Sequence, residues 1–281
     1  MKKGIDVSTF QGLIDWEKVK DDGVKFAIIR GGYGRSEVDE RFKENYKNAR
    51  KAGVPIGVYH YSYATTVERA KQEAAFCLSY LKGKKFEYPV AFDIEDKTQT
   101  SLSKKLLTDI TYAFCEEIEK HGYYVCIYSS KSFLTDKLDM KRLSRFDVWV
   151  AQWNSSCTYK GEYGLWQFSD NGKINGISGR VDLDRAYKDY PSIMKEYGLN
   201  GFKKQSVKPT EKTYKKGEVV NLKNAALYVS STANKPSARI TGKYYIYDGE
   251  KVNGRYRITN SKKNVGKLPT VNYVTGWVDL K

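Results

Sequence analysis

The 281-residue chain has no long apolar run, few cysteines and almost no histidine. No stretch of apolar residues is long enough to cross a bilayer, which argues against membrane insertion. The first six residues, Met1-Lys2-Lys3-Gly4-Ile5-Asp6, lack the apolar segment that a signal peptide requires. We therefore expect a protein that stays in the cytoplasm, or that leaves it by a route which this chain does not encode.

Cysteine and histidine are too sparse to indicate a metal centre. The four cysteines are spread along the chain without a Cys-x-x-Cys pair: Cys77, Cys115, Cys126 and Cys157. This spacing favours small buried free thiols over disulfides or metal ligands. His60 and His121 are the only histidines, which leaves a zinc site short of ligands. The sequence predicts no metal and no cofactor.

Positive charge is concentrated near the carboxyl terminus. Residues 201–281 hold 17 of the 49 Lys and Arg residues but only 5 of the 33 Asp and Glu residues, a balance of +12. The first 200 residues are close to neutral by comparison. A basic segment on such a body suggests an anionic partner, either nucleic acid, a membrane surface or an acidic wall polymer.

The sequence pattern predicts two domains. Residues 1–199 alternate strand-like and helix-like segments, with eight strands and little helix in the last third. This pattern indicates an α/β fold, namely an irregular TIM-like barrel whose helical ring is incomplete. Residues 200–213 have no apolar period and are expected to form a linker. Residues 214–281 contain short strands and the turn signals Asp248-Gly249 and Asn253-Gly254, which predict a small all-β barrel.

Three strand-like segments carry acids between branched apolar or aromatic residues: Ile5-Asp6-Val7, Phe92-Asp93-Ile94-Glu95 and Val181-Asp182-Leu183. Successive side chains of a strand point to opposite faces, so the acids face away from the packed layer. We expect all of them to lie late in their strands, where parallel barrels place their chemistry. Acids in such strands are costly unless they gather at a site, and clustered carboxylates are what a glycosidase uses.

The pair Asp93 and Glu95 is the strongest candidate for catalysis. Two acids two residues apart on one strand face one pocket, and their repulsion raises one pKa, which keeps a general acid protonated. Glu95 lies nearer the mouth, so we expect it to protonate the glycosidic oxygen. Asp93 would orient the acetamido group of the substrate or stabilise the positive charge on the sugar. A lone Asp-x-Glu often marks only a solvated strand end, but Asp6 and Asp182 in matching contexts favour the site.

Aromatic residues crowd the same strand ends, and flat rings stack on sugar faces. Most of these rings must belong to the core, because aromatic side chains bury large areas in any barrel. We expect Tyr33, Tyr61 and Trp153 to contact the ligand. His60 lies on the opposite face of its strand from Tyr61 and is expected to be a core histidine.

Seven motifs occur in order along the barrel: Gly4-Ile5-Asp6-Val7-Ser8, Ile29-Arg30-Gly31-Gly32-Tyr33-Gly34, Gly57-Val58-Tyr59-His60-Tyr61, Phe92-Asp93-Ile94-Glu95, Trp149-Val150-Ala151-Gln152-Trp153, Trp166-Gln167-Phe168 and Val181-Asp182-Leu183-Asp184. Together with Trp16 they resemble glycoside hydrolase family 25, the Chalaropsis-type lysozymes of phage endolysins and bacterial autolysins. The resemblance covers about residues 3–197. It implies an irregular eight-stranded barrel and hydrolysis of the β-1,4 bond between N-acetylmuramic acid and N-acetylglucosamine in peptidoglycan.

The same resemblance implies roles for the acids. Glu95 takes the place of the family's proton donor, and Asp93, Asp6 and Asp182 line its pocket. Double displacement, neighbouring-group participation and inversion all remain open as stereochemical courses. The tail is similar to bacterial SH3-like wall-binding modules in its length, its Tyr-rich strands and the segment Ala226-Leu227-Tyr228-Val229-Ser230-Ser231-Thr232-Ala233.

These expectations describe an endolysin-like muramidase that is made in the bacterial host cytoplasm and acts on the cell wall after release. Its partners would be peptidoglycan and, through residues 214–281, the wall itself, with no nucleic acid. Three alternatives remain: an inactive glycan-binding barrel, a chitin-directed hydrolase, and nucleic-acid binding by the basic tail.

Overall fold

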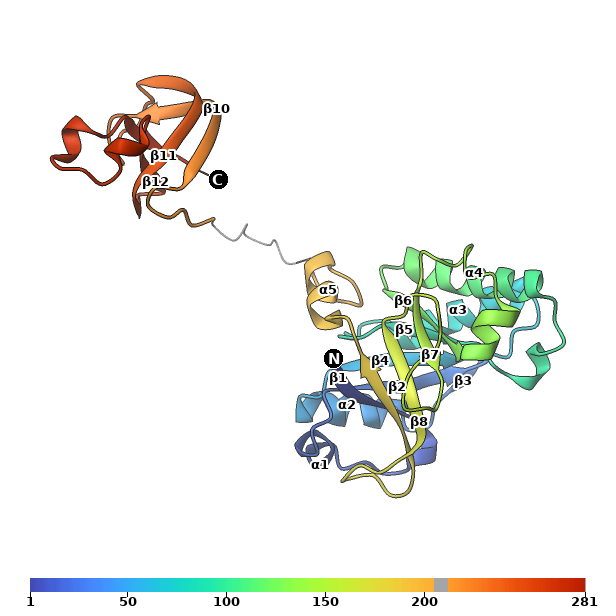
Figure 1. Cartoon of the computed structure of the whole chain (residues 1–281). Helices are drawn as coiled ribbons and strands as arrows, with labels where there is room; N and C mark the ends of the chain where they lie inside the picture. The colour runs from blue at the N-terminus through green and yellow to red at the C-terminus, as the bar shows by residue number, and fades with distance from the viewer. Residues whose placement is uncertain (205–211, 281) are drawn as a thin grey trace. The chain divides into compact units, whose positions relative to one another are not determined.

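Eight strands from the first 186 residues close into a barrel in the computed structural model, which describes residues 1–204 and 212–280 (Figure 1). The barrel order is β1-β9-β8-β7-β6-β5-β4-β2, and pairing of β1 with β2 closes the ring. The short β3 extends the edge of β2. The strands are β1 (Lys2–Val7), β2 (Phe26–Tyr33), β3 (Glu37–Val38), β4 (Ile56–Tyr61), β5 (Val90–Asp93), β6 (Val125–Ser130), β7 (Asp147–Ala151), β8 (Leu165–Gly172) and β9 (Val181–Ala186).

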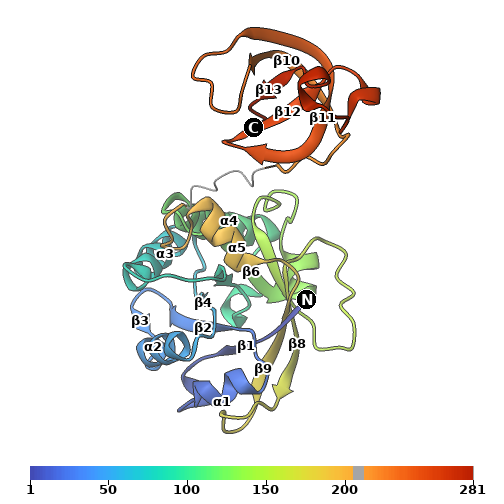
Figure 2. The same cartoon turned by 90° about the vertical axis from the view of Figure 1, so that its left-hand side faces the viewer.

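One barrel strand runs against the others. Seven strands from β1 to β8 are mutually parallel, whereas β9 is antiparallel to both of its neighbours, β8 and β1 (Figure 2). A crossover to a parallel strand needs a dozen or more residues. Only residues 173–180 separate β8 from β9, so the chain turns back as a hairpin. The predicted barrel is therefore confirmed as α/β, but β9 makes it mixed rather than parallel.

The helices cover the barrel unevenly, as predicted for an incomplete ring. They are α1 (Trp16–Asp21), α2 (Phe42–Ala52), α3 (Val67–Leu81), α4 (Lys104–Lys120) and α5 (Tyr190–Tyr197). Thr66 and Ser103 cap α3 and α4 by accepting hydrogen bonds from backbone N–H groups of the first turn. Between β6 and β7 the chain makes only the π-helical turn η3 (Phe133–Lys137). No helix in the described residues is long and apolar enough to span a membrane.

Two apolar layers hold the barrel together. The outer layer packs strand residues such as Ile5, Val7 and Phe92 against the helices. The inner layer fills one end of the barrel, where the rings of Phe26 and Tyr88 stack at 4.3 Å. Gly4 lies directly against the Phe26 ring. A Cβ at this position would overlap the ring, which explains why the residue is glycine. The opposite end of the barrel contains the polar residues described below.

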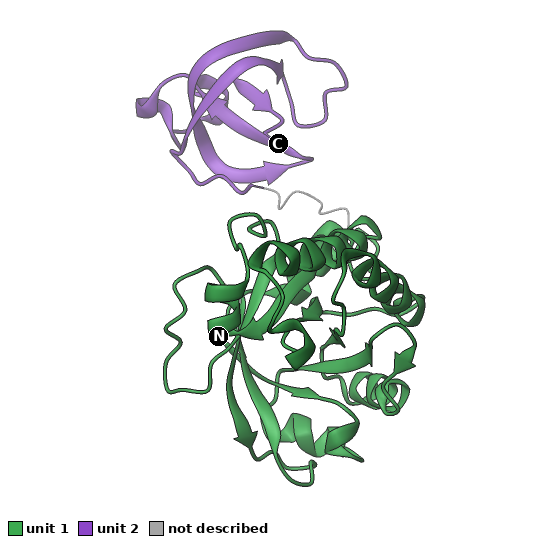
Figure 3. Cartoon of the chain, turned by 90° about the vertical axis from the view of Figure 1, so that its right-hand side faces the viewer, with its two compact units in different colours: residues 1–206 green, residues 207–281 purple. Residues whose placement is uncertain are grey.

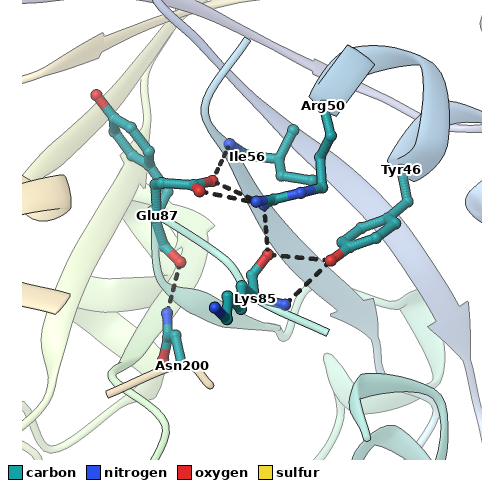
Figure 4. A network of polar contacts seen from close by, with 7 residues as sticks. Tyr46, Arg50, Ile56, Lys85, Glu87 and Asn200 are labelled. Atoms are coloured by element: carbon teal, nitrogen blue, oxygen red, sulfur yellow. Dashed lines mark hydrogen bonds and ion pairs between the residues drawn. The ribbon is translucent and has the colours of Figure 1, made fainter. Parts of the chain in front are cut away.

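A polar network closes the amino end of β4 and β5 (Figure 4). Arg50 donates to Glu87 and to the carbonyl of Lys85, and Glu87 accepts from the backbone N–H of Ile56. Asn200 is completely buried beside this network and donates to the carbonyl of Tyr88 at 2.7 Å. Asn200 is therefore part of the barrel rather than the first residue of a linker.

The compact units of the chain are residues 1–206 and 207–281 (Figure 3). The predicted linker 200–213 therefore begins too early, since the ordered barrel residues Asn200, Gly201 and Phe202 fall within it. Residues 205–211 of that segment lie outside the described residues.

The second unit is a small closed barrel of four antiparallel strands, β10 (Val219–Tyr228), β11 (Ala238–Val252), β12 (Arg255–Thr259) and β13 (Gly276–Val278). Asn253 and Gly254 both have positive φ, as a two-residue hairpin turn between β11 and β12 requires. The turn predicted at Asp248-Gly249 is wrong. These residues lie within β11, at a shift in its pairing register with β12. The small all-β barrel itself is confirmed.

Candidate active site

A pocket of about 190 Å³ opens among the barrel strands at the carboxyl ends of the parallel strands. Its lining includes all four acids expected from the sequence, namely Asp6, Asp93, Glu95 and Asp182. A larger hollow of about 650 Å³ lies elsewhere on the barrel, but lysine and apolar side chains make up most of its lining. The chemistry of the lining, rather than volume, identifies the smaller pocket as the candidate site.

The strand arrangement explains how acids from distant segments meet. Asp6 is the last but one residue of β1, and Asp93 is the last residue of β5. Asp182 is the second residue of β9, so the expectation that it lies late in its strand is wrong. Because β9 is antiparallel, its beginning lies at the same end of the barrel, and Asp182 is paired with Asp6 in the sheet register.

Glu95 lies just beyond its expected strand. Strand β5 ends at Asp93, but the N–H of Ile94 still bonds to the carbonyl of Tyr128, so the chain remains beside β6. Glu95 follows as an exposed residue at the mouth of the pocket. Desolvation by the pocket walls, together with the charges of Asp182 and Asp96, raises its pKa.

Asp93 is buried deeper. Burial, followed by the charge of Glu95, raises the pKa of Asp93 well above its usual range, while Arg30 acts in the opposite direction. Its Oδ1 has no hydrogen-bond partner among the described residues. An unpaired buried carboxyl oxygen beside a second acid can interact with a substrate group in the pocket.

Asp6 and Asp182 complete the acidic cluster. Burial and the charges of Asp184 and Asp182 raise the pKa of Asp6, although the amide of Gln167 donates to its Oδ2 at 2.8 Å. Burial and the nearby Asp170 raise the pKa of Asp182 to about 6. The pocket therefore holds several acids that retain protons at higher pH than they would in water.

Arg30 is a lining residue that sequence reasoning missed. Its Nε donates to Asp39 at 2.8 Å, and its guanidinium lies over the rings of Phe10 and Tyr33 at 4.9 and 5.3 Å. A charged side chain at the end of the apolar segment Phe26–Ile29 was the available signal. Arg30 supplies positive charge to a site that is otherwise acidic.

Gln167 and Asp184 were also missed. Gln167 lies on β8 and lines the pocket, and Asp184 is completely buried two residues after Asp182 on the same face of β9. The same period-two pattern that selected Asp182 also selects Asp184, so its signal was present. The signal for Gln167 was weaker, because an amide between aromatic residues is compatible with many roles.

Of the three aromatic residues expected to contact ligand, only Tyr61 lines the pocket, and its hydroxyl donates to Asp96 at 3.0 Å. Tyr33 and Trp153 contact lining residues instead. Tyr33 packs against Arg30, and Trp153, which is 60% exposed, donates from Nε1 to Gln167 at 2.9 Å. His60 is buried with Nδ1 2.8 Å from the Tyr80 hydroxyl, as expected for a core histidine.

The four cysteines are free thiols, and three of them are buried. In the described residues, no group of three His, Cys, Asp or Glu side chains has the arrangement of a metal site.

Known proteins resemble the first unit of this chain. The chain is 31% identical over 183 residues to an autolytic lysozyme of Clostridium acetobutylicum, an alignment that covers 65% of this chain and 55% of that protein. The chain thus spans about half the length of that curated relative. Among solved structures, it is similar to the CTP1L endolysin, with 28% identity and a TM-score of 0.62, over 69% of this chain and 70% of that one.

A bacterial lysozyme from Streptomyces coelicolor is also similar, with 28% identity and a TM-score of 0.60, over 66% of this chain and 92% of that one. Residues 5–177 match the family described as Glycosyl hydrolases family 25, a stretch that contains Asp6, Asp93 and Glu95. Because this match covers more than half of the chain, the protein belongs to glycosyl hydrolase family 25.

Proposed function

We propose that this protein is a muramidase, which hydrolyses the β-1,4 bond between N-acetylmuramic acid and N-acetylglucosamine in peptidoglycan. One observation carries the proposal: Asp6, Asp93, Glu95 and Asp182 line a single pocket of a family 25 barrel, and the pKa of each is raised. Raised pKa values among clustered carboxyls are what acid-assisted cleavage of a glycosidic bond needs.

Glu95 is the proposed general acid. It lies at the pocket mouth, where a glycosidic oxygen can approach, and its raised pKa favours the protonated form before the bond breaks. Proton transfer from Glu95 to the leaving oxygen neutralises the charge that would otherwise develop there.

Asp93 is the proposed electrostatic partner. The departing sugar acquires positive charge at its anomeric carbon, and Asp93 can stabilise that charge or orient the neighbouring acetamido group. Its unpaired Oδ1 supports an interaction with substrate, and Arg30 favours the ionised form that stabilisation of a cation requires. Asp6 and Asp182 add two further carboxyl groups to the lining of the same pocket.

Fragment analysis tests the bond assignment. Purified peptidoglycan and chitin are each digested with the full chain, and the released fragments are identified by mass spectrometry. The proposal requires new reducing ends on muramic acid. Reducing ends on glucosamine in peptidoglycan would contradict it, whereas cleavage of chitin alone would favour the chitin-directed alternative.

We further propose that the second unit binds the bacterial cell wall and that the protein acts there after release from the cell. The +12 balance of residues 201–281 supports attraction to wall polymers that carry phosphate or carboxylate. The similarity of the first unit to an endolysin supports the place of action. Sedimentation of the full chain with purified walls, compared with the barrel alone, tests the binding.

A further inference from the structure

Asp184 has an unusual position for a carboxylate. Its side chain is completely buried inside the barrel, where Oδ1 accepts a hydrogen bond from Trp149 Nε1 at 2.8 Å. Oδ2 has no N–H or O–H partner among the described residues. The carboxyl group of Asp6 is also in hydrogen-bonding contact with Asp184.

Acids dominate the electrostatic surroundings of Asp184 among the described residues. The ionisable groups that act on Asp184 are Asp6 on β1 and Asp182 on β9, both of them acids. Asp6 is influenced by Asp184 and Asp182 in the same way, and its hydrogen-bond donor Gln167 is a neutral amide. Two buried carboxylates in contact repel each other strongly when both are ionised, so the stable arrangement contains a proton between them.

We propose that Asp184 is a positioning residue that shares one proton with Asp6, so that a hydrogen bond joins the two carboxyl groups. The bond satisfies the free Oδ2 of Asp184 and completes a chain from Trp149 through Asp184 to Asp6. Gln167 donates to Asp6 from another strand, so two hydrogen bonds fix the Asp6 carboxyl group toward the pocket. The proposal deepens the hydrolytic function proposed above and rests on it for its activity readout only.

The proton has a predictable effect on stability. Burial raises the pKa of Asp184 to about 8, whereas an unfolded aspartate has a pKa of about 3.9. Between these values the folded state holds a proton that the unfolded state has lost. The contribution of this group to the free energy of unfolding is therefore present at pH 4 and is lost as the pH rises toward 8.

The test compares Asp184→Asn, Asp184→Ala and the wild type as full-length chains. An asparagine can accept from Trp149 through Oδ1 and donate to Asp6 through Nδ2, so it reproduces the protonated acid without being able to lose the proton. Asp184→Asn should retain kcat/KM on peptidoglycan within about threefold at pH 5 to 6. Asp184→Ala, which offers no donor, should lose at least about tenfold.

Thermal unfolding provides a readout that does not depend on activity. The Tm of Asp184→Asn minus that of the wild type should increase by roughly 3 °C or more between pH 4 and pH 8, since only the wild type loses its proton. Asp189→Asn is the matched control, because Asp189 is exposed and its pKa is lowered by Ser192 and Lys2. Its Tm difference should move in the opposite direction or not at all.

Two results would overturn the proposal. One is a Tm difference for Asp184→Asn that stays constant with pH, because no proton would then be held. The other is a folded Asp184→Asn enzyme as inactive as Asp184→Ala, because the negative charge would then be needed. If the wild type cleaves no peptidoglycan, the proposed function is wrong. The Tm comparison would still show whether Asp184 and Asp6 share a proton.

Discussion

The amide of Gln167 donates to the carboxylate of Asp6 in one fixed orientation. Its Nε2 lies 2.8 Å from Asp6 Oδ2, while its Oε1 accepts from the Tyr128 hydroxyl at 3.0 Å and from Trp153 Nε1 at 2.9 Å. Two donors on the carbonyl oxygen leave only the NH₂ group to face the acid. Trp153, expected from the sequence to bind ligand, therefore also has a structural role in the site.

This arrangement predicts that Gln167→Glu will lower activity strongly, although glutamate and glutamine have nearly the same size and shape. The new carboxylate would still accept from Tyr128 and Trp153 but would repel Asp6 instead of donating to it. We expect kcat/KM to fall by at least about tenfold, the order of magnitude that corresponds to 1.4 kcal/mol, with the circular dichroism spectrum unchanged. Gln152→Glu, nearby but outside the pocket, is the control. Equal activities of the two variants would contradict the role of Gln167.

Replacement of the proposed acid tests the mechanism directly. Glu95→Gln keeps the shape of the side chain but cannot donate a proton in the same way, so activity should fall by about 10²–10⁴-fold. Asp93→Asn should be nearly as damaging, whereas Asp6→Asn and Asp182→Asn should cost less. The measurement is the release of reducing ends from peptidoglycan, with the exposed Glu162→Gln as control. A Glu95→Gln enzyme with most of its activity would exclude Glu95 as the acid.

The pH profile should respond to Asp182. A general acid works while protonated, so kcat/KM declines as the pH rises through the pKa of Glu95. Desolvation and then the charge of Asp182 raise that pKa, so Asp182→Asn should lower it. The alkaline limb of the profile is therefore expected to move to lower pH, whereas Asp189→Asn should leave it in place. Movement to higher pH would show that Glu95 does not define this limb.

The sequence predicted which faces of the strands carry acids but not the direction in which each strand runs. The alternation around Asp6, Asp93 and Asp182 is a local property, and all three acids line the pocket. The direction of β9 depends on the short connection from β8, so the position of Asp182 early in its strand could not be read from the alternation. Contacts between distant segments, such as Gln167 with Asp6 in the pocket, leave no local pattern at all.

The barrel boundary predicts a sharp difference between two truncations. Asn200 accepts from the N–H of Tyr124 at 2.7 Å and donates to the carbonyl of Tyr88, and an unpaired buried group costs about 1–3 kcal/mol. Deletion of residues 205–281 should leave a stable barrel, whereas deletion of residues 200–281 should lower its Tm markedly. Asn200→Ala in the full chain should reproduce the loss, and the exposed Asn171→Ala should not. Equal Tm values for the two truncations would contradict this boundary.

The last prediction concerns the basic second unit. If it anchors the enzyme, a chain ending at residue 204 should cleave soluble glycan fragments as fast as the full chain but lyse intact cells poorly. Residues 212–281 alone should bind purified walls, with an affinity that weakens as salt rises, because screening shortens the reach of its +12 balance. The rival explanation is that the lysines only keep a small barrel soluble. Wall binding by the barrel alone that equals binding by the full chain would favour that rival, and binding of duplex DNA at physiological salt would favour a nucleic-acid partner.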